Sequence, residues 1–420
     1  MAGRTIAAPL PGGRGLTAPG RPLSAFRHRE FRFLLASTMA LQVGSWVQTI
    51  GQGWLVKHDL GGSATDLGLV ALARGGSLLL VSPLGGFVAS KFERRKQLMF
   101  YTLVSAVIAT LLAVLIAAGR IEIWMVYVTA VVAGVVEALA GPIRGLLVYE
   151  SVKGEDLTAA VALNALGGNA MRVIGPAIGG ALIGSVGTEG AFEVQAGCIV
   201  LALGLTWFLS KSHPTLAEQR ERFVQSLAGG LRYVTRDPTM RVIVLMGFLP
   251  SLLVYPYVTF LPVFAKDVLH SDESGYGYLA AAVGLGSLVG GTVVAFTAGG
   301  RRKMGPPMIW TCFIYASFVG VFTLTRDLWL AVAALAVAGV FHSMYSAYQA
   351  SLMQLQSAPE YRSRVLSLQT MMWGSTPFVA LGMGQLIDRY EAPHVVGAFM
   401  AAAAVLTLVV YGASKNVRRV

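Results

Sequence analysis

The chain has 420 residues, of which 55% are hydrophobic and 13% are charged, and its mean hydropathy is +0.64. Soluble domains carry about 25% charged residues, so this composition excludes a water-soluble globular protein and predicts one that is embedded in a membrane. The formal net charge of +12 does not indicate a nucleic-acid partner, because the basic residues are scattered between apolar segments and form no single patch.

Residues 1–30 are rich in Gly, Pro and Arg, contain no apolar signal-peptide core, and are predicted to form a disordered cytoplasmic tail. Crossing about 30 Å of hydrocarbon takes about 20 apolar residues, and twelve later stretches fit that length. We expect all of them to be helices, because backbone exposed to lipid must satisfy its own hydrogen bonds. Their limits are 32–56, 67–90, 98–118, 123–147, 159–186, 191–210, 241–265, 276–298, 307–325, 328–350, 363–386 and 395–414.

The positions of Lys and Arg predict the orientation of these spans. The tails and the loops that follow even-numbered spans hold 25 of the 33 basic residues, the opposite loops hold five, and three lie within spans. Basic loops stay in the cytoplasm. We therefore expect a multi-pass protein of the cell membrane, inner or plasma, with both termini in the cytoplasm.

The chain also contains an internal repeat with an offset of about 205 residues. Gly85 and Gly86 align with Gly290 and Gly291, and Glu155 aligns with Glu360. Each repeat holds six predicted spans, and parallel repeats of this kind occur in many secondary transporters. We predict an all-α membrane protein with twelve transmembrane helices in two pseudo-symmetric six-helix bundles, 31–210 and 241–414, joined by a cytoplasmic linker, 211–240, and followed by a short cytoplasmic tail, 415–420.

The first and fourth spans of each repeat carry polar side chains, whereas the third and sixth are almost uniformly apolar. Polar residues recur at helical spacing and so share one helix face, and a polar face inside a bilayer must meet protein or a water-filled cavity. We therefore predict a substrate cavity lined by these four helices. The candidate residues on them are Gln42, Trp46, Gln52, Glu137, Arg144, Tyr255, Tyr257, His342, Tyr345 and Gln349.

Three ionisable residues are expected near the middle of the membrane, namely Glu137, Arg172 and His342. A charge there costs a few kcal/mol, which makes each a functional candidate. Glu137 either couples transport to protons or forms a fixed ion pair with Arg172 or Arg144. His342 either takes part in coupling or is a neutral histidine hydrogen-bonded to a tyrosine. Both alternatives are open at this point.

The second and fifth spans of each repeat are rich in glycine, as at Gly179 and Gly180. Small residues let helix backbones approach closely in lipid. We predict that these helices form the seam between the halves, where sliding or rocking occurs, although static close packing predicts the same glycines.

Several motifs resemble the major facilitator superfamily. The segment 85–96, which begins with Gly85 and Gly86 and ends near Arg94 and Arg95, resembles the superfamily's loop signature between helices two and three. Residues 175–180, with Gly175 and Pro176, resemble its antiporter signature on helix five. The runs 141–150, 157–163 and 359–365, together with Arg172, are similar to the branch that contains enterobactin-type siderophore exporters and macrolide and multidrug efflux proteins. The resemblance implies gating roles for Gly85, Gly86, Arg94, Arg95, Gly175, Pro176, Gly179, Gly180, Arg362 and Arg364.

One position departs from the superfamily pattern. The aspartate that helps to latch the two halves on the cytoplasmic side is replaced by Ser90. A latch from Arg94 or Arg95 to Glu93, to Glu150 or to a helix end is an alternative.

Together these features predict a secondary exporter that moves an amphipathic, drug-like or siderophore-like small molecule by alternating access, in exchange for protons, and that functions as a monomer in the lipid bilayer. The alternatives are a transporter of lipid or lysolipid and a membrane sensor or scaffold that has lost transport. Enzymatic activity is not expected, because the chain has no HExxH, Walker A or GxSxG motif. Cys198 and Cys312 give no metal-binding spacing, and no cofactor is expected.

Overall fold

The computed structural model describes residues 23–210, 232, 234–297, 303–358, 361–414 and 417. Every regular element within these ranges is helical, as the composition predicted. Most of the predicted N-terminal tail, the linker residues 211–231 and most of the tail 415–420 lie outside the described residues.

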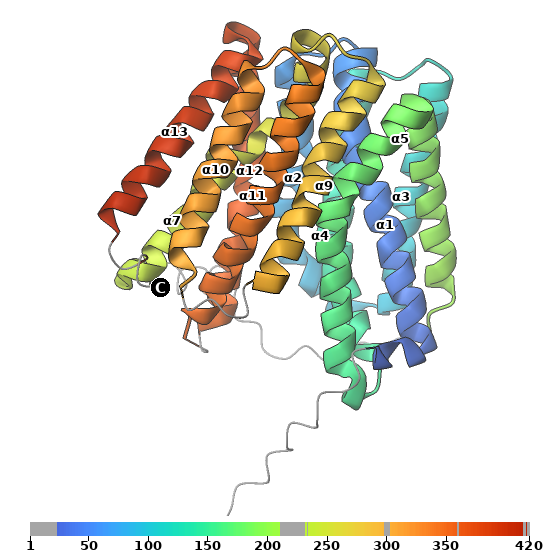
Figure 1. Cartoon of the computed structure of the whole chain (residues 1–420). Coiled ribbons are helices and arrows are strands. Elements are labelled where there is room, and N and C mark those ends of the chain that lie inside the picture. The colour runs from blue at the N-terminus through green and yellow to red at the C-terminus, as the bar shows by residue number, and fades with distance from the viewer. Residues whose placement is uncertain are drawn as a thin grey trace, which may run out of the picture.

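The long helices of the first half carry five labels, the last of which covers two helices. They are α1 (Arg29–Trp54), α2 (Ala64–Lys91), α3 (Arg94–Ala117), α4 (Ile123–Glu150) and α5 (Leu157–Trp207). The short helical segment η1 (Ser24–Arg27) precedes α1, η2 (Leu55–Asp59) follows α1, and η3 (Gly154–Asp156) precedes α5. The label α5 covers two helices that meet at a kink at Gly187, which has a φ of 72°, and they correspond to the predicted spans 159–186 and 191–210. Glycine tolerates this left-handed conformation, and Figure 1 shows the chain turning back near this point.

The second half contains α7 (Pro238–Leu253), η4 (Tyr255–Phe260), α8 (Leu261–Val263), η5 (Phe264–Val268), α9 (Glu273–Thr297), α10 (Gly305–Leu324), α11 (Leu328–Leu355), α12 (Arg362–Tyr390) and α13 (Ala392–Ala413). Helix α7 begins after Asp237, whose carboxylate accepts hydrogen bonds from the amides of Thr239 and Met240. The predicted span 241–265 is not one continuous α-helix, since α7 ends at Leu253 and a tighter helix follows. Pro256 and Pro262 lack the amide hydrogen that a regular helix needs.

Nine helical segments in the described part of the chain are long and apolar enough to cross a membrane. They include α2, α3, α4, α9, α10, α11 and α13, the segment Ile174–Trp207 of α5 and the segment Pro238–Val268. Helices α1 and α12 are not among them. Both carry several polar residues, such as Gln42 and Gln48 on α1.

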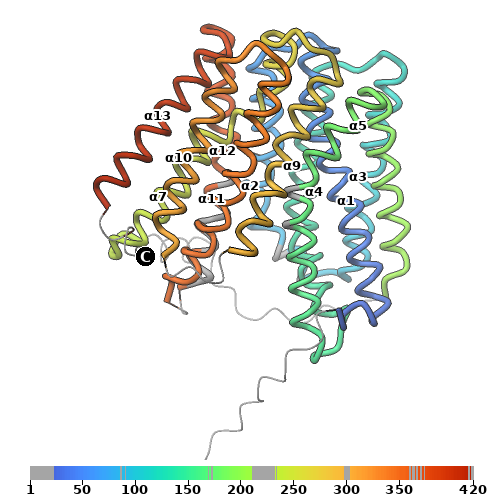
Figure 2. Tube along the Cα trace, viewed as in Figure 1, coloured from blue at the N-terminus to red at the C-terminus, as the bar shows by residue number. Residues whose placement is uncertain are grey.

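The helices of the two halves form two groups, with α2 and α9 between them (Figures 1 and 2). Contacts between the halves run mainly along two pairs, α5 with α9 and α2 with α12. We call the end with loops 60–63, 269–272 and 325–327 the capped end, and the opposite end, which carries residues 23–28 and Ser414, the terminal end. The capped end is uppermost in Figure 1.

Glycines make close contacts along both pairs, at positions where the sequence pattern predicted close packing. A Cβ atom built on Gly180 of α5 lies 2.5 Å from the carbonyl oxygen of Gly277 on α9. A Cβ atom on Gly75 of α2 lies 2.3 Å from Pro377 on α12. At these places the backbone of a helix in one half lies directly against a helix of the other half, which holds the two halves close together.

Candidate substrate and coupling sites

The first half contains a polar cavity among α1, α2, α3, α4 and α5. It holds about 680 Å³ of empty space, part of it open to solvent. Three predicted site residues line it, namely Gln42, Glu137 and Arg144. Its other polar lining residues are Ser45, Gln48, Arg74, Ser105, Thr129 and Gln195. We call it the first-half cavity.

Arg74 connects three helices at the wall of this cavity. From α2, its guanidinium donates hydrogen bonds to the hydroxyls of Ser45 and Thr49 on α1, both at 2.7 Å. It also forms an ion pair with Glu137 on α4, with 3.4 Å between Nη2 and Oε2. The side chain of Arg74 is 20% exposed and that of Glu137 is 45% exposed. The carboxylate is therefore held on one side and faces open space on the other.

Arg144 follows Glu137 by seven residues on α4, which places both side chains on one helix face, about 10 Å apart along the axis. It makes no hydrogen bond or ion pair with any residue that the structure describes. Among the described residues, the carboxylate of Glu137 is in direct contact with Arg74, whereas Arg144 interacts with it electrostatically without a direct contact. The side chain of Arg172, the other partner expected for Glu137, lies outside the described residues.

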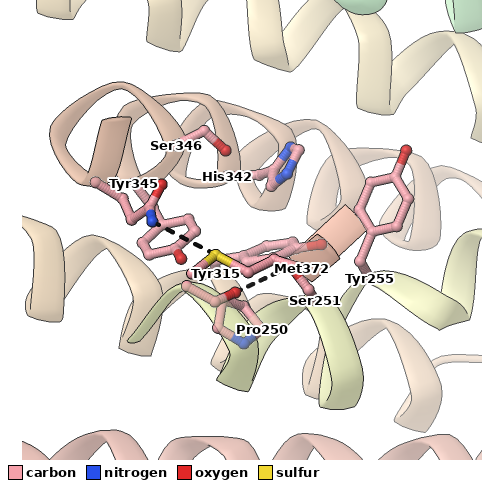
Figure 3. A pocket seen from close by; sticks show the side chains of 10 residues that line it. Pro250, Ser251, Tyr255, Tyr315, His342, Tyr345, Ser346 and Met372 are labelled. Carbon is pink, nitrogen blue, oxygen red and sulfur yellow. Dashed lines mark hydrogen bonds between the residues drawn. The ribbon is translucent and has the colours of Figure 1, made fainter. Parts of the chain in front are cut away.

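A second cavity lies in the other half and holds about 390 Å³, again including space open to solvent. Figure 3 shows His342 of α11 facing Tyr255 of η4 and Tyr315 of α10, with ring centroids 5.6 and 5.0 Å apart, respectively. Tyr345 donates a hydrogen bond to the carbonyl oxygen of Met246 at 2.6 Å. The Nε2 atom of Gln349 lies 2.7 Å from the sulfur of Met353. This second-half cavity collects Tyr255, His342, Tyr345 and Gln349, all of which were predicted site residues.

Three further candidates line neither cavity among the described residues. Trp46 packs against Gly175 of α5, where an added Cβ atom would lie 2.1 Å from the indole ring. Gln52 is buried and donates a hydrogen bond to the hydroxyl of Thr129 at 3.0 Å. Tyr257 is 1% exposed within the apolar core. In this structure these side chains hold helices together.

The predicted gating glycines divide into two groups. An added Cβ atom on Gly85 would meet the carbonyl oxygen of Ala138 on α4, and one on Gly179 would meet Ile50 on α1, so both pack within the first half. Gly180 instead contacts α9 of the second half. Pro176 lies inside α5 between Gly175 and Gly179.

Basic residues at the start of α3 also stay within the first half. Arg94 forms an ion pair with Glu150 at the end of α4, and Arg95 donates a hydrogen bond to the carbonyl oxygen of Trp207. These contacts join α3 to α4 and α5. The surroundings of Gly86 and the side chains of Ser90, Arg362 and Arg364 lie outside the part of the chain that the structure describes.

At the capped end, polar contacts join the two halves directly. The carboxylate of Asp388, at the end of α12, accepts hydrogen bonds from the amides of Ala64 and Thr65 at 2.8 and 2.9 Å. These are the first amides of α2, so Asp388 caps a helix of the other half. Lys57 forms an ion pair with Asp267 at 2.7 Å.

The backbone contributes to the same closure. Ser274 and Tyr276 of α9 donate hydrogen bonds to the carbonyl oxygens of Gly184 and Ile50, at 3.1 and 2.9 Å. The aromatic rings of Trp54 and Tyr276 stack with centroids 5.1 Å apart. The structure is therefore closed at the capped end.

Sequence reasoning missed Arg74 and Asp388 as site residues. A charged residue inside an apolar span was the available signal for Arg74, since α2 carries it among Leu and Ala residues. No sequence signal indicates that Asp388 caps α2, which is 323 positions away. Within the described residues, no group of three His, Cys, Asp or Glu side chains is arranged to hold a metal ion.

Comparison with known proteins finds similarity to membrane transporters. Residues 20–418 match the family described as transmembrane secretion effector. The multidrug efflux pump Tap of Mycolicibacterium fortuitum is 24% identical over 370 residues, which is 84% of this chain and 88% of Tap. The staphyloferrin A transporter of Staphylococcus aureus is 25% identical over 259 residues, 61% of this chain and 65% of that protein. The match to the Bacillus subtilis MFS-type transporter YfiS, 24% identical, covers 49% of each chain.

Among solved structures, the nucleoside transporter NupG superimposes with a TM-score of 0.69 at 14% identity, covering 91% of this chain and 98% of NupG. A bacterial homologue of the lysosomal transporter Spinster, in an inward-facing conformation, gives a TM-score of 0.65 at 14% identity, covering 91% of this chain and 96% of that one. At this identity the likeness shows the fold alone. The first two curated relatives match over less than two thirds of their length.

Proposed function

Because this chain belongs to the transmembrane secretion effector family of the major facilitator superfamily, we propose that it exports amphipathic small molecules, drug-like or siderophore-like, in exchange for protons. The chain is a multi-pass membrane transporter. In this proposal it works as a monomer in the cell membrane, by alternating access, with both termini in the cytoplasm and the capped end outside. The similarity to Tap, a multidrug efflux pump, supports export of drug-like molecules, and the similarity to the staphyloferrin A transporter supports a siderophore-like substrate.

The observation that carries the proposal is the link from Glu137 to Arg74. The carboxylate joins α4 to Arg74 of α2, and Arg74 joins both to α1. Protonation of Glu137 removes its charge, which weakens the ion pair and the link among the three helices. A substrate group that hydrogen-bonds to ionised Glu137 competes with the proton, and this competition is the reciprocal coupling that antiport requires.

Alternating access is supported by the contacts at the capped end. Asp388, Lys57 and Tyr276 each join the two halves there. These contacts must break before the central region opens at the capped end, and the glycine-lined pairs α5 with α9 and α2 with α12 provide surfaces on which the halves rock. Transporters built from parallel repeats move largely as such rigid bodies.

Transport in proteoliposomes tests the coupling. The substrate is first identified by comparing, by mass spectrometry, the compounds exported by cells with and without the chain. Glu137→Gln removes the titration and keeps the size, so we expect it to lose uphill transport driven by a pH gradient and to keep downhill exchange. Glu193→Gln, which changes an exposed carboxylate on α5, is the matched control and should transport normally.

Uphill transport by Glu137→Gln would show that Glu137 is a structural ion-pair partner, and His342→Gln would then test the other titratable candidate. If pH-driven transport survives both substitutions, proton antiport through these residues is wrong. Absence of flux from every folded preparation would instead favour the sensor or scaffold.

A further inference from the structure

Arg144 and Glu137, two opposite charges in the first-half cavity, have hydrogen-bonding groups without a partner among the described residues. The guanidinium of Arg144 lines the cavity and donates to no acceptor among them. The carboxylate of Glu137 pairs with Arg74 through Oε2 alone, and Oε1 accepts no hydrogen bond from a described residue. An unpaired guanidinium is costly where water is scarce, so Arg144 is the stronger attractor of a ligand.

From this arrangement we propose that the transported substrates carry a carboxylate, bound by Arg144, and a neutral hydrogen-bond donor about 10 Å away, bound by Glu137. The spacing is the helical rise over the seven residues between the two side chains. The proposal rests on the proposed function, because it assigns the substrate class to the same cavity.

The carboxylate follows from the geometry and charge of Arg144. A guanidinium presents a planar fork of N–H groups that matches a carboxylate in a bidentate pair. The described charged side chains that line the cavity are two arginines and one glutamate, so an anion is the complementary ligand. The amides of Gln42 and Gln195 line the same cavity and offer further hydrogen bonds.

The substrate group that binds Glu137 is a neutral hydrogen-bond donor, such as a hydroxyl or an amide N–H, because Arg74 lies beside that carboxylate. Its guanidinium lies 3.4 Å from the Glu137 carboxylate and repels a second cation. A neutral donor bonds most strongly to the ionised carboxylate. Substrate and proton therefore compete at Glu137, which agrees with exchange of one for the other.

Binding of a short probe series to the purified chain in nanodiscs tests this assignment. The probes are 8-hydroxyoctanoate, which carries both groups, octanoate, which lacks the hydroxyl, 1,8-octanediol, which lacks the carboxylate, and octyl phosphate, which carries a different anion. Apparent dissociation constants come from the rise in unfolding temperature with probe concentration. No gradient is applied, so the result does not depend on coupling or direction.

We expect 8-hydroxyoctanoate to bind roughly tenfold more tightly than octanoate, since it adds a hydrogen bond to a charged acceptor. We expect 1,8-octanediol to bind weakest. Arg144→Gln should weaken both carboxylates by roughly tenfold or more, and Arg144→Lys, which keeps the charge and tests folding, should weaken them less. Glu137→Gln should remove only the advantage of the hydroxyl. Arg120→Gln, which removes an exposed positive charge, should change nothing.

Equal binding of the carboxylates by Arg144→Gln and the unchanged chain would overturn the proposal. Tighter, Arg144-dependent binding of octyl phosphate would also overturn it, in favour of a phosphate-bearing ligand such as a lipid headgroup. If binding follows the expected pattern while proteoliposomes show no proton-driven flux, the proposed function fails and the substrate class stands.

Discussion

Arg74 joins α2 to α1 and α4 through three contacts of one guanidinium group. The hydroxyls of Ser45 and Thr49 fix its position, and the remaining contact is with Glu137. A positive charge fixed at this place attracts the carboxylate of Glu137 and orients it. Arg74 is therefore a positioning residue for the carboxylate that we propose as the proton site.

Substitutions at Arg74 and Thr49 should distinguish the effect of the Arg74 positive charge on transport from the effect of its hydrogen bonds to α1. Arg74→Gln removes the cation, and we expect uphill transport driven by a pH gradient to fall roughly tenfold, since hydrogen bonds to a charged group contribute about 1.5–3 kcal/mol. Arg74→Lys should restore part of the activity. Thr49→Val leaves the ion pair in place and is the control. Uphill transport at the normal rate by Arg74→Gln would show that Glu137 needs no fixed cation.

Residue identity in the sequence predicted which charged side chains line a cavity better than it predicted their neighbours. Glu137 and Arg144 were found because charged residues in apolar spans are costly, and both line the first-half cavity. The partner of Glu137 was expected on the fifth span or on its own helix, whereas the described partner lies on α2. Periodicity places a side chain on a helix face, but it does not state which helix that face meets.

At the scale of elements, the contact between α5 and α9 depends on two glycines. A Cβ atom on Gly180 lies 2.5 Å from the carbonyl oxygen of Gly277 and 2.9 Å from Cβ of Ala280. Both neighbours are backbone or directly attached to it, so neither can rotate away. A larger residue at this position must push the two halves apart.

Gly180→Val should therefore reduce both stability and transport. We expect the free energy of unfolding to fall by about 1–3 kcal/mol, as for overpacked cores, and transport to fall while the protein still reaches the membrane. Gly204→Val changes a glycine on the same helix whose Cβ position is open, and it should have little effect. Unfolding temperature and proteoliposome flux measure the two quantities. Normal flux by Gly180→Val would show that this contact does not govern movement.

Hydropathy predicted the limits of the helices well but missed one interruption inside a predicted span. The predicted span 98–118 is close to α3 (Arg94–Ala117), because charged residues bound that apolar run. The structure also breaks the chain at Gly187, between the predicted spans 159–186 and 191–210. By contrast, it divides the predicted span 241–265 near Val254, where the prediction had no break. Apolar content reports burial in lipid or protein, whereas such breaks depend on one proline or one glycine.

For the whole molecule, the distribution of basic residues predicts the sidedness, and cysteine labelling can test it. Cys198 and Cys312 are first replaced by Ala. A cysteine at Gln225, in the predicted linker, should then react only with a reagent in the cytoplasm. One at Asp272, at the capped end, should react only from outside. The reverse labelling would contradict the orientation and the direction of export that follows from it.

The two ends of the molecule differ in how the halves are joined. At the capped end, Asp388 of α12 holds the first amides of α2. At the other end, Ser90 stands at the position where the superfamily pattern has its latch aspartate, and the neighbouring Arg94 pairs with Glu150 inside the first half. A carboxylate thus stabilises closure at the capped end, while the corresponding aspartate is missing from the signature near the terminal end. We expect the resting equilibrium to favour closure at the capped end.

Asp388→Asn tests this bias directly. An amide keeps the shape but loses the negative charge that faces two helix amides, so the population open at the capped end should rise roughly threefold to tenfold. Spin labels on the loops 60–63 and 269–272 report it as a new, longer distance. Asp327→Asn is a matched control, because Asp327 caps α11 within one half through the amide of Leu330, and removing that charge should leave the distance distribution unchanged. An unchanged distribution in Asp388→Asn as well would show that packing along α5 with α9 and α2 with α12, and not the cap, keeps this end closed.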